Sequence, residues 1–426
     1  MMKVLWFCNT PAAGEQFLRV NGMGGGWLKS LDRQIQEYVD LHIAFYYPYQ
    51  LNQFNHGKAS YHPIYSGNII WNTFKKHFIV SEKDEQDFCK YTEIIKQVKP
   101  DIIHIHGTEN PFGCIIGKIK IPVVVSIQGN ITVYHHKFFA GIEKKYLSTK
   151  TPVHSLKQLF VSSNFRYNYK SFTIKKQIEL KNLKNTKYII GRTEWDKRIT
   201  SVLAPDSVYF HGDEILRDAF YENQWEYPAQ KELIVHSTNG DSFYKGFETI
   251  CLALNELHKI HIDITWQVAG ITEKSLIYKI VKKKLKKNFP TKGLVLLGTL
   301  PEQELIESMK KSNIYVMSSH IENSPNNLCE AMIMGMPCIA TFAGGTGSLL
   351  KDGEEGLLIQ AGDPWVMAGA ILELLNNKER AITMGVNART RALQRHNKSR
   401  IVADLIETYQ TIINENYLNQ TSKSVF

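Results

Sequence analysis

The sequence predicts an α/β protein with two doubly wound domains, and three observations lead to that prediction. A chain of 426 residues is too long for one ordinary domain and suits two domains of roughly 200 residues each. Short apolar runs alternate with longer helical patterns through both halves, as in βαβ units with a parallel sheet. Finally, an irregular polar and aromatic stretch at 210–230 separates the two series.

These observations place an N-terminal Rossmann-like domain at 1–212 and a second Rossmann-like domain at 213–400. We expect a final helix at 401–426 to pack back toward the N-terminal domain. The two domains would face each other across a cleft. Ligands bind outside the carboxyl ends of strands in such sheets, so the residues just after each strand are the candidates for a site.

The expected elements follow from the apolar periodicity. The expected strands are 4–8, 41–45, 102–106, 123–127 and 188–190 in the first half, then 233–237, 264–269, 294–297, 314–317, 338–341 and 356–359. The expected helices are 27–38, 85–98, 247–257, 275–289, 302–311, 325–334, 365–376 and 381–396.

Composition and charge limit the function classes. Six scattered cysteines form no Cys-x-x-Cys pair, which excludes a typical zinc or redox dithiol site and favours the cytoplasm. The N-terminus is too short for a secretory signal, and no apolar run reaches the ~20 residues of a membrane span. We therefore expect a cytoplasmic protein, with peripheral association with the inner face of the cell membrane as an option.

The positive charge is concentrated in one segment. Residues 135–200 hold 15 Lys and Arg against 4 Asp and Glu, whereas the whole chain has a net charge of +10. A solvated basic face is the simple interpretation. The alternative is contact with an anionic surface, either a membrane leaflet, favoured by interleaved aromatics, or a phosphate-bearing substrate. No recognisable nucleic-acid-binding module is present.

The stretch "SHIENSPNNLCEAMIMGMP" at 319–337 has the strongest functional signal. Ser324 and Pro325 predict the start of a helix, and Gly335 predicts its end. The unpaired N–H groups of its first turn, at Asn326, Asn327 and Leu328, would form an anion site suited to a diphosphate. Glu322 in the preceding turn and Glu330 on the helix would then bracket a nucleotide sugar, with Glu330 accepting from a ribose hydroxyl.

This Glu-x7-Glu spacing and the following "CEAMIMGMPCIATFAGG" resemble the family 4 glycosyltransferases of the GT-B fold, as used in bacterial surface polysaccharide synthesis. The resemblance covers nearly the whole chain and is strongest at 233–365. It implies that Glu322 contacts the donor sugar and that Glu330 holds the ribose. The family often has Pro-Glu where this chain has Gly347 and Ser348, so no role is assigned to that missing Glu.

A second segment of the same half is "STNGDSFYKGFETICLAL". Lys245 opens a helix after a strand, where it could reach a phosphate, and it resembles the family's Lys-Gly motif. Gly270 directly follows a strand, Asn239 lies two residues after one, and both are further donor-binding candidates. The Arg that the family commonly has before this Lys is absent here.

The first half offers weaker candidates. Glycines precede the first helix in "NGMGGGWL", and the resemblance places such a loop beside the donor. His106 ends a strand and is a candidate proton carrier or sugar contact, with a core histidine as the alternative. Arg192 could face the cleft, although a salt bridge to Glu194 or Asp196 is an equal alternative. The remaining candidates are Gly24, Gly25 and Gly26 for the donor and Glu109 and Gln128 for the acceptor side.

The sequence analysis thus predicts a glycosyltransferase that moves a sugar from a nucleotide-sugar donor to a glycan or lipid-linked acceptor. The resemblance implies retention of anomeric configuration, and the absence of Asp-x-Asp agrees with a metal-independent site. Glu322, Lys245 and His106 are the catalytic candidates, with Glu322 as a covalent nucleophile the weaker option. A sugar-nucleotide epimerase and a non-catalytic nucleotide-sugar binding subunit are the alternatives. We expect no nucleic acid, metal or cofactor.

Overall fold

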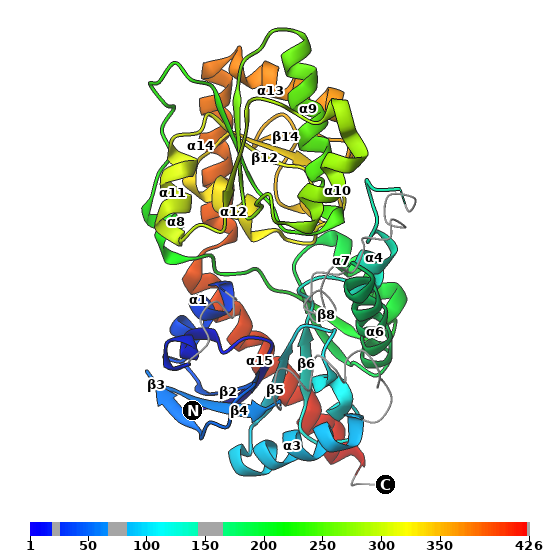
Figure 1. Ribbon diagram of the computed structural model, residues 1–426. Helices are drawn as coiled ribbons and strands as arrows, with labels where there is room; N and C mark the ends of the chain where they lie inside the picture. The colour runs from blue at the N-terminus through cyan, green and yellow to red at the C-terminus, as the bar shows by residue number, and fades with distance from the viewer. Residues whose placement is uncertain (19–25, 67–82, 144–164, 424–426) are drawn as a thin grey trace. The chain divides into compact units, whose positions relative to one another are not determined.

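The computed structural model describes residues 1–18, 26–66, 83–143 and 165–423, and the chain divides into two compact units (Figure 1). Unit 1 comprises Met1–Thr132, Lys170–Ile215 and His396–Phe426. Unit 2 comprises Val133–Tyr169 and Leu216–Arg395. Each unit is built on its own largely parallel sheet, so the predicted fold of two Rossmann-like α/β domains is confirmed.

Unit 1 contains an eight-stranded sheet in the order β3-β4-β2-β1-β5-β6-β7-β8. All neighbours are parallel except β3 and β4, which form an antiparallel pair at one edge. The strands are β1 (Lys3–Cys8), β2 (Asp40–Tyr47), β3 (Phe54–His56), β4 (Ala59–Tyr65), β5 (Ile102–His106), β6 (Val123–Ser126), β7 (Tyr188–Gly191) and β8 (Val208–His211).

Helices cover both faces of this sheet, which explains why its central strands are rich in apolar residues. Successive side chains of a strand point to opposite faces, so alternate residues of β1 enter different cores. Val4 and Trp6 pack with α1 and α15, while Leu5 and Phe7 pack with α3. The helices are α1 (Gly26–Ile35), α3 (Lys83–Val98), α4 (Ile131–His136), α6 (Phe165–Lys184), α7 (Glu194–Leu203) and α15 (Lys398–Lys423), of which α4 and α6 span the division between units.

Unit 2 contains a six-stranded parallel sheet in the order β11-β10-β9-β12-β13-β14. Helices α9, α10 and α13 lie on one side of it, and α8, α11, α12 and α14 lie on the other (Figure 1). The strands are β9 (Ile234–Thr238), β10 (Thr265–Ala269), β11 (Leu294–Gly298), β12 (Ile314–Met317), β13 (Cys338–Thr341) and β14 (Leu357–Ile359). The helices are α8 (Asp218–Glu222), α9 (Phe247–Lys259), α10 (Leu276–Leu285), α11 (Glu302–Lys310), α12 (Asn326–Met334), α13 (Pro364–Leu375) and α14 (Lys378–Arg395).

The expected elements are present, and several others were missed. The missed strands are β3, β4 and β8, and the missed helices are α4, α6, α7 and α8. Strand β4 includes Ser60 and His62, and β8 has an exposed Val208, so neither shows the apolar run of a central strand. Helix α6 falls in the basic segment, and α8 falls in the irregular polar stretch at 210–230. Charged and aromatic residues there obscure the apolar periodicity that marks a helix.

The division between units also differs in detail from the predicted boundaries at 212 and 400. The units meet in sequence at Ile215 and Leu216, and again at Arg395 and His396. The larger difference is that Val133–Tyr169 belongs to unit 2, although it lies in the first half of the chain. Among the described residues, no helix combines the length and the apolar character needed to cross a membrane.

Candidate functional site

The carboxyl ends of β9 and β12 bring the two strongest motifs of unit 2 together. These strands are neighbours in the sheet, so the loops that follow them lie side by side. The Ser318 hydroxyl and the Asn239 amide both donate to the Lys245 carbonyl, at 2.9 and 3.1 Å. Gly246 has φ of +72°, and an added Cβ would overlap the Ser318 carbonyl oxygen. Glycine therefore allows the two loops to approach this closely.

Lys245 and Glu322 form a hydrogen-bonded ion pair at this point. Lys245 Nζ lies 2.5 Å from Glu322 Oε1, and the side chains are 25% and 6% exposed. Ser319 Oγ donates to the same carboxylate oxygen at 2.7 Å. Burial acts against the charge of Lys245, but Glu322 and Tyr244 outweigh it and hold the Lys245 pKa above its ordinary value. The ammonium group is therefore charged at neutral pH and can bind an anion.

Helix α12 begins beside this pair, although its start differs from the predicted one. Pro325 occupies the N-cap, with no side-chain capping bond, so the predicted Ser324 cap is wrong. The Leu328 N–H donates to the Pro325 carbonyl and to Asn327 Oδ1, so the predicted Leu328 donor is wrong as well. The N–H groups of Asn326 and Asn327 have no acceptor among the described residues. These two donors, rather than three, remain for a phosphate.

Two further features fix the start and the end of α12. Asn327 Nδ2 donates to the Thr238 carbonyl at the end of β9, at 2.7 Å. The Asn326 side-chain oxygen is buried with no hydrogen-bond partner among the described residues. Gly335 ends the helix in the left-handed conformation, with φ of 88°, which confirms the predicted stop.

Glu330 lies on α12 and makes a bidentate ion pair that the sequence analysis did not predict. Arg217 Nε lies 2.7 Å from Glu330 Oε1, and Arg217 Nη2 lies 2.8 Å from Oε2. Burial raises the pKa of the Glu330 carboxyl, and the Arg217 guanidinium opposes that shift by stabilising the carboxylate. Glu302 also lies near Arg217, at 3.5 Å. A ribose hydroxyl at Glu330 would thus meet a carboxylate that is already oriented.

The remaining candidates in unit 2 border the same strand ends. Gly270 follows β10 with φ of +89°, and an added Cβ would overlap the Asn239 carbonyl oxygen. Asp241, which occupies the region where the related family commonly has an arginine, accepts from Leu276 N and Ile277 N at 3.0 and 2.7 Å. Asp241 therefore caps α10 and supplies no cation to this site.

Comparisons with known proteins show which family most of unit 2 resembles. Residues 220–391, which contain the Lys245–Glu322 pair and Glu330, match the family model described as Glycosyl transferases group 1. The chain resembles this family over these residues, which are called the glycosyl transferase domain after it. The fold and the family that the sequence resembles are thereby confirmed for this part of the chain.

Two curated relatives match within the chain. An uncharacterized glycosyltransferase of Methanocaldococcus jannaschii is 33% identical over 145 residues, which is 34% of this chain and 39% of the relative. The capsular polysaccharide biosynthesis glycosyltransferase CapM of Staphylococcus aureus is 29% identical over 103 residues, which is 24% of this chain and 27% of the relative. The matched regions thus span well under half of these relatives.

Two solved structures resemble the chain over nearly its full length. Sucrose-phosphate synthase from Thermosynechococcus elongatus has a TM-score of 0.73 at 14% identity and covers 97% of this chain and 100% of its own. HepE of Anabaena, in complex with UDP and glucose, has a TM-score of 0.63 at 14% identity, with coverage of 96% and 100%. At such identities the likeness concerns the fold.

The predicted sites outside the glycosyl transferase domain lie in unit 1, where His106 is fully enclosed. His106 is 1% exposed, and neither ring nitrogen has a hydrogen-bond partner among the described residues. Burial lowers its pKa well below the ordinary value, and His104 and Arg192 add to that shift. A neutral ring of this kind is a weak base, which argues against the predicted role as a proton carrier.

His106 borders a small cavity of unit 1. The cavity holds about 30 Å³, enough for one or two water molecules. Its lining includes Trp27, His104, Ser126, Arg192 and Thr408. A water molecule or one ligand hydroxyl would fit the unsatisfied nitrogens of His106, whereas a whole sugar would not fit.

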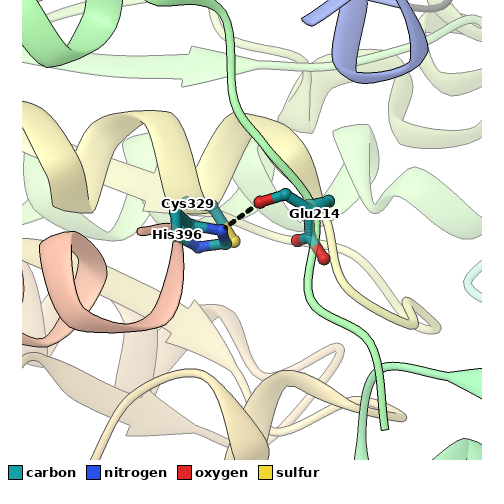
Figure 2. A group of neighbouring side chains, drawn as sticks. All are labelled: Glu214, Cys329 and His396. Atoms are coloured by element: carbon teal, nitrogen blue, oxygen red, sulfur yellow. Dashed lines mark hydrogen bonds between the residues drawn. The ribbon is translucent and has the colours of Figure 1, made fainter. Parts of the chain in front are cut away.

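Arg192 pairs with a residue that the sequence analysis did not consider. Its Nε lies 3.6 Å from Glu214 Oε2, and its guanidinium carbon lies 4.2 Å from the Trp27 ring centroid. Of the expected alternative partners, Asp196 contacts Arg192 through the backbone, because Asp196 Oδ2 accepts from the Arg192 N–H at 2.8 Å. Figure 2 shows that the Glu214 backbone is held as well, because His396 Nδ1–H donates to its carbonyl oxygen at 2.8 Å.

The other acceptor-side candidates follow strands of unit 1, as expected. Glu109 accepts from Asn9 Nδ2 at 2.9 Å, and Gln128 lies in the loop after β6. Gly26 opens α1, whereas Gly24 and Gly25 lie outside the described residues. Roles for these residues in acceptor or donor binding remain predictions.

The important residues that sequence reasoning missed are Arg217 and Tyr134. Arg217 lies in a stretch that appeared to be an irregular linker, and no spacing relates it to Glu330. Tyr134 Oη lies 3.4 Å from Glu322 Oε2, although the two residues are 188 positions apart. Only the fold brings such distant residues together, so a single sequence contains no signal for either contact.

Proposed function

We propose that this protein is a glycosyltransferase that moves a sugar from a nucleotide-sugar donor to a glycan or lipid-linked acceptor. The observation that supports it best is the paired arrangement of Lys245 with Glu322 and Arg217 with Glu330. Lys245, Glu322 and Glu330 lie in the glycosyl transferase domain, and Arg217 lies just before it in the sequence. A cation, two free amides and two oriented carboxylates match the chemistry of a sugar diphosphate.

The ion pair between Lys245 and Glu322 suggests how the donor would be bound. An incoming diphosphate offers Lys245 a more highly charged partner, so the ammonium turns from Glu322 to the phosphates. The N–H groups of Asn326 and Asn327 bind the same phosphates at the positive end of the helix. Glu322 is then free to accept hydrogen bonds from sugar hydroxyls, while Glu330 accepts from the ribose.

The reaction would be driven by stabilisation of the departing diphosphate. Negative charge develops on the phosphate oxygens as the bond to the anomeric carbon breaks, and Lys245 neutralises it. We propose retention of configuration and independence from metal, as the related family implies. Uridine diphosphate sugars are the first donors to test, because HepE was solved with UDP and glucose.

The test is release of nucleoside diphosphate from a panel of nucleotide sugars, with and without glycan or lipid-linked acceptors. The wild-type protein should release it from at least one donor, and both Glu322→Gln and Lys245→Ala should lose that activity. Full activity in both variants would overturn the site assignment. Activity that persists in excess EDTA would support metal independence, and NMR of the product would report the anomeric configuration.

We also propose that the basic segment at 135–200 contacts an anionic membrane, which would bring a lipid-linked acceptor to the enzyme. Exposed Lys184, Lys187 and Lys197 support this proposal. Tyr169 does not, because it stacks on His135 and contacts Phe138 within unit 2. Flotation with anionic liposomes at low salt tests the proposal, and a protein that stays at the bottom of the gradient would contradict it.

A further inference from the structure

The segment of residues 133–143 lies against the donor-site residues of the glycosyl transferase domain. Tyr134 Oη donates to Glu322 Oε2 at 3.4 Å, and the Tyr134 ring meets the Tyr244 ring edge-on, with centroids 5.3 Å apart. Further along, Phe138 and Phe139 both contact Phe243, with centroids 5.9 Å apart in each case. The segment therefore contacts the turn that holds Lys245 as well as the carboxylate of Glu322.

The end of this segment is held by a close approach at Gly141. Gly141 has φ of +75°, and an added Cβ would overlap Glu248 Oε1 and the His320 ring. Its carbonyl oxygen accepts from Lys284 Nζ at 2.6 Å. His320 in turn lies 2.5 Å from Glu248. These contacts fix the backbone seven residues beyond Tyr134 and restrict where its hydroxyl can lie.

The two oxygens of Glu322 have different partners. Oε1 accepts from Lys245 and Ser319, at 2.5 and 2.7 Å, whereas Oε2 accepts from Tyr134. Burial raises the pKa of the Tyr134 hydroxyl well above its ordinary value, and Glu322 adds to that shift. Tyr134 therefore keeps its proton and acts as a donor. When Lys245 turns to the diphosphate, Ser319 and Tyr134 remain to orient the carboxylate.

We propose that Tyr134 is a positioning residue for Glu322, and that the 133–143 segment thereby helps the site to recognise the sugar of the donor. The proposal rests on the function proposed above. Its chemistry is specific: Tyr134 donates to the carboxylate that would meet the sugar, and among the described residues no hydrogen bond joins Tyr134 to Lys245, Asn326 or Asn327. Loss of its hydroxyl should change sugar recognition and leave diphosphate binding in place.

The test compares binding of UDP-glucose and UDP, by calorimetry, in the wild type and in Tyr134→Phe. This substitution keeps the ring and removes only the hydroxyl. We expect UDP affinity to change by less than about twofold, and UDP-glucose affinity to fall about fivefold, since a hydrogen bond to a charged group is worth roughly this much or more. Tyr38→Phe, at a 62% exposed position, is the matched control and should change neither affinity.

If the role of Tyr134 were purely structural, the substitution would weaken the binding of both ligands equally. An unchanged ratio of the two affinities would therefore overturn the proposal.

A second measurement needs no ligand: a double-mutant cycle of Tyr134→Phe and Glu322→Gln on the unfolding equilibrium. We expect the change in the unfolding equilibrium constant of the double variant to differ by about threefold from the product of the changes in the two single variants. If the wild type binds no nucleotide sugar from a panel, the proposed function is wrong, and so is the proposed role of Tyr134 in recognition of the sugar. The cycle then decides whether the contact stabilises the fold.

Discussion

The strand ends of the two units and their surroundings differ in chemistry. In unit 2 they hold Lys245 with Glu322 and Arg217 with Glu330, and each cation remains about one quarter exposed. In unit 1, strand β5 contains His104 and ends at His106, and both residues are 1% exposed. Burial lowers the pKa of each histidine, to about 3 for His104, so both rings are neutral.

This difference follows from the free-energy cost of burying a charge. A charge near a strand end is costly to bury, so a paired cation that stays partly exposed remains available for an anionic ligand. The neutral rings of His104 and His106 pack against each other instead, with centroids 3.8 Å apart. In addition, the two nitrogens of His104 meet Tyr409 Oη and Ser126 Oγ at 2.6 and 2.5 Å. Unit 2 is thus organised for an anion, and this end of unit 1 is organised for stability.

The largest expected effect comes from Lys245→Ala in unit 2. Removal of the cation that stabilises the leaving diphosphate should lower kcat by about 100-fold or more, by analogy with the loss of a single transition-state donor. Initial rates with saturating donor measure it. The control is Lys259→Ala, which removes an exposed lysine paired with Glu256 and should leave kcat unchanged. A kcat for Lys245→Ala within twofold of wild type would show that Lys245 does not stabilise the leaving diphosphate, and would contradict the proposed difference between the units.

The second prediction concerns Arg217, which holds Glu330. Arg217→Ala leaves a buried carboxylate without its cation and should lower the free energy of unfolding by about 3 kcal/mol. Arg217→Lys should fall between this variant and wild type, because an ammonium cannot reproduce the two parallel hydrogen bonds. Urea unfolding followed by circular dichroism provides the measurement. Equal stability of all three proteins would show that the bidentate pair contributes nothing to the fold.

The third prediction concerns the close approach of the two loops in unit 2. Gly246→Ala places a Cβ against the Ser318 carbonyl oxygen at a positive φ and should cost about 2 kcal/mol of stability. Gly240→Ala is the matched control, because no atom lies within 4 Å of its added Cβ. Thermal unfolding of both variants distinguishes the sites. A Gly246→Ala protein as stable as Gly240→Ala would contradict the proposed role of the glycine.

The smallest effect is a pH dependence that originates in unit 1. The pKa of His104 is about 3 in the folded protein and about 6.5 when unfolded, because burial disfavours the charged ring. Between these values the unfolded state binds the additional proton, so acidification should reduce stability by up to about 1.4 kcal/mol per pH unit. His104→Asn should make this slope shallower, as measured by urea unfolding at pH 6.5, 5.5 and 4.5. The exposed His261→Asn is the control, and an unchanged slope in His104→Asn would contradict the assignment.

The sequence predicted the fold and the donor-side motifs because their signals are local. Apolar runs defined the central strands, and the segment at 319–337 contained Glu322, Glu330 and the helix stop at Gly335. The partners could not be predicted in this way. Arg217 and Tyr134 reach these carboxylates through the topology of the fold. The Leu328 N–H illustrates a second limit, because the side chain of its neighbour Asn327 competes for the donor.

The central claim is that the ion-paired strand ends of unit 2 bind the nucleotide-sugar donor, and calorimetric titration with UDP tests it most directly. The wild type and Lys58→Ala, which removes an exposed lysine of unit 1, should bind UDP with equal affinity. Lys245→Ala and Glu330→Ala should bind it at least about tenfold more weakly, provided that thermal unfolding shows them to be folded. Equal UDP affinity in all four folded proteins would contradict the claim.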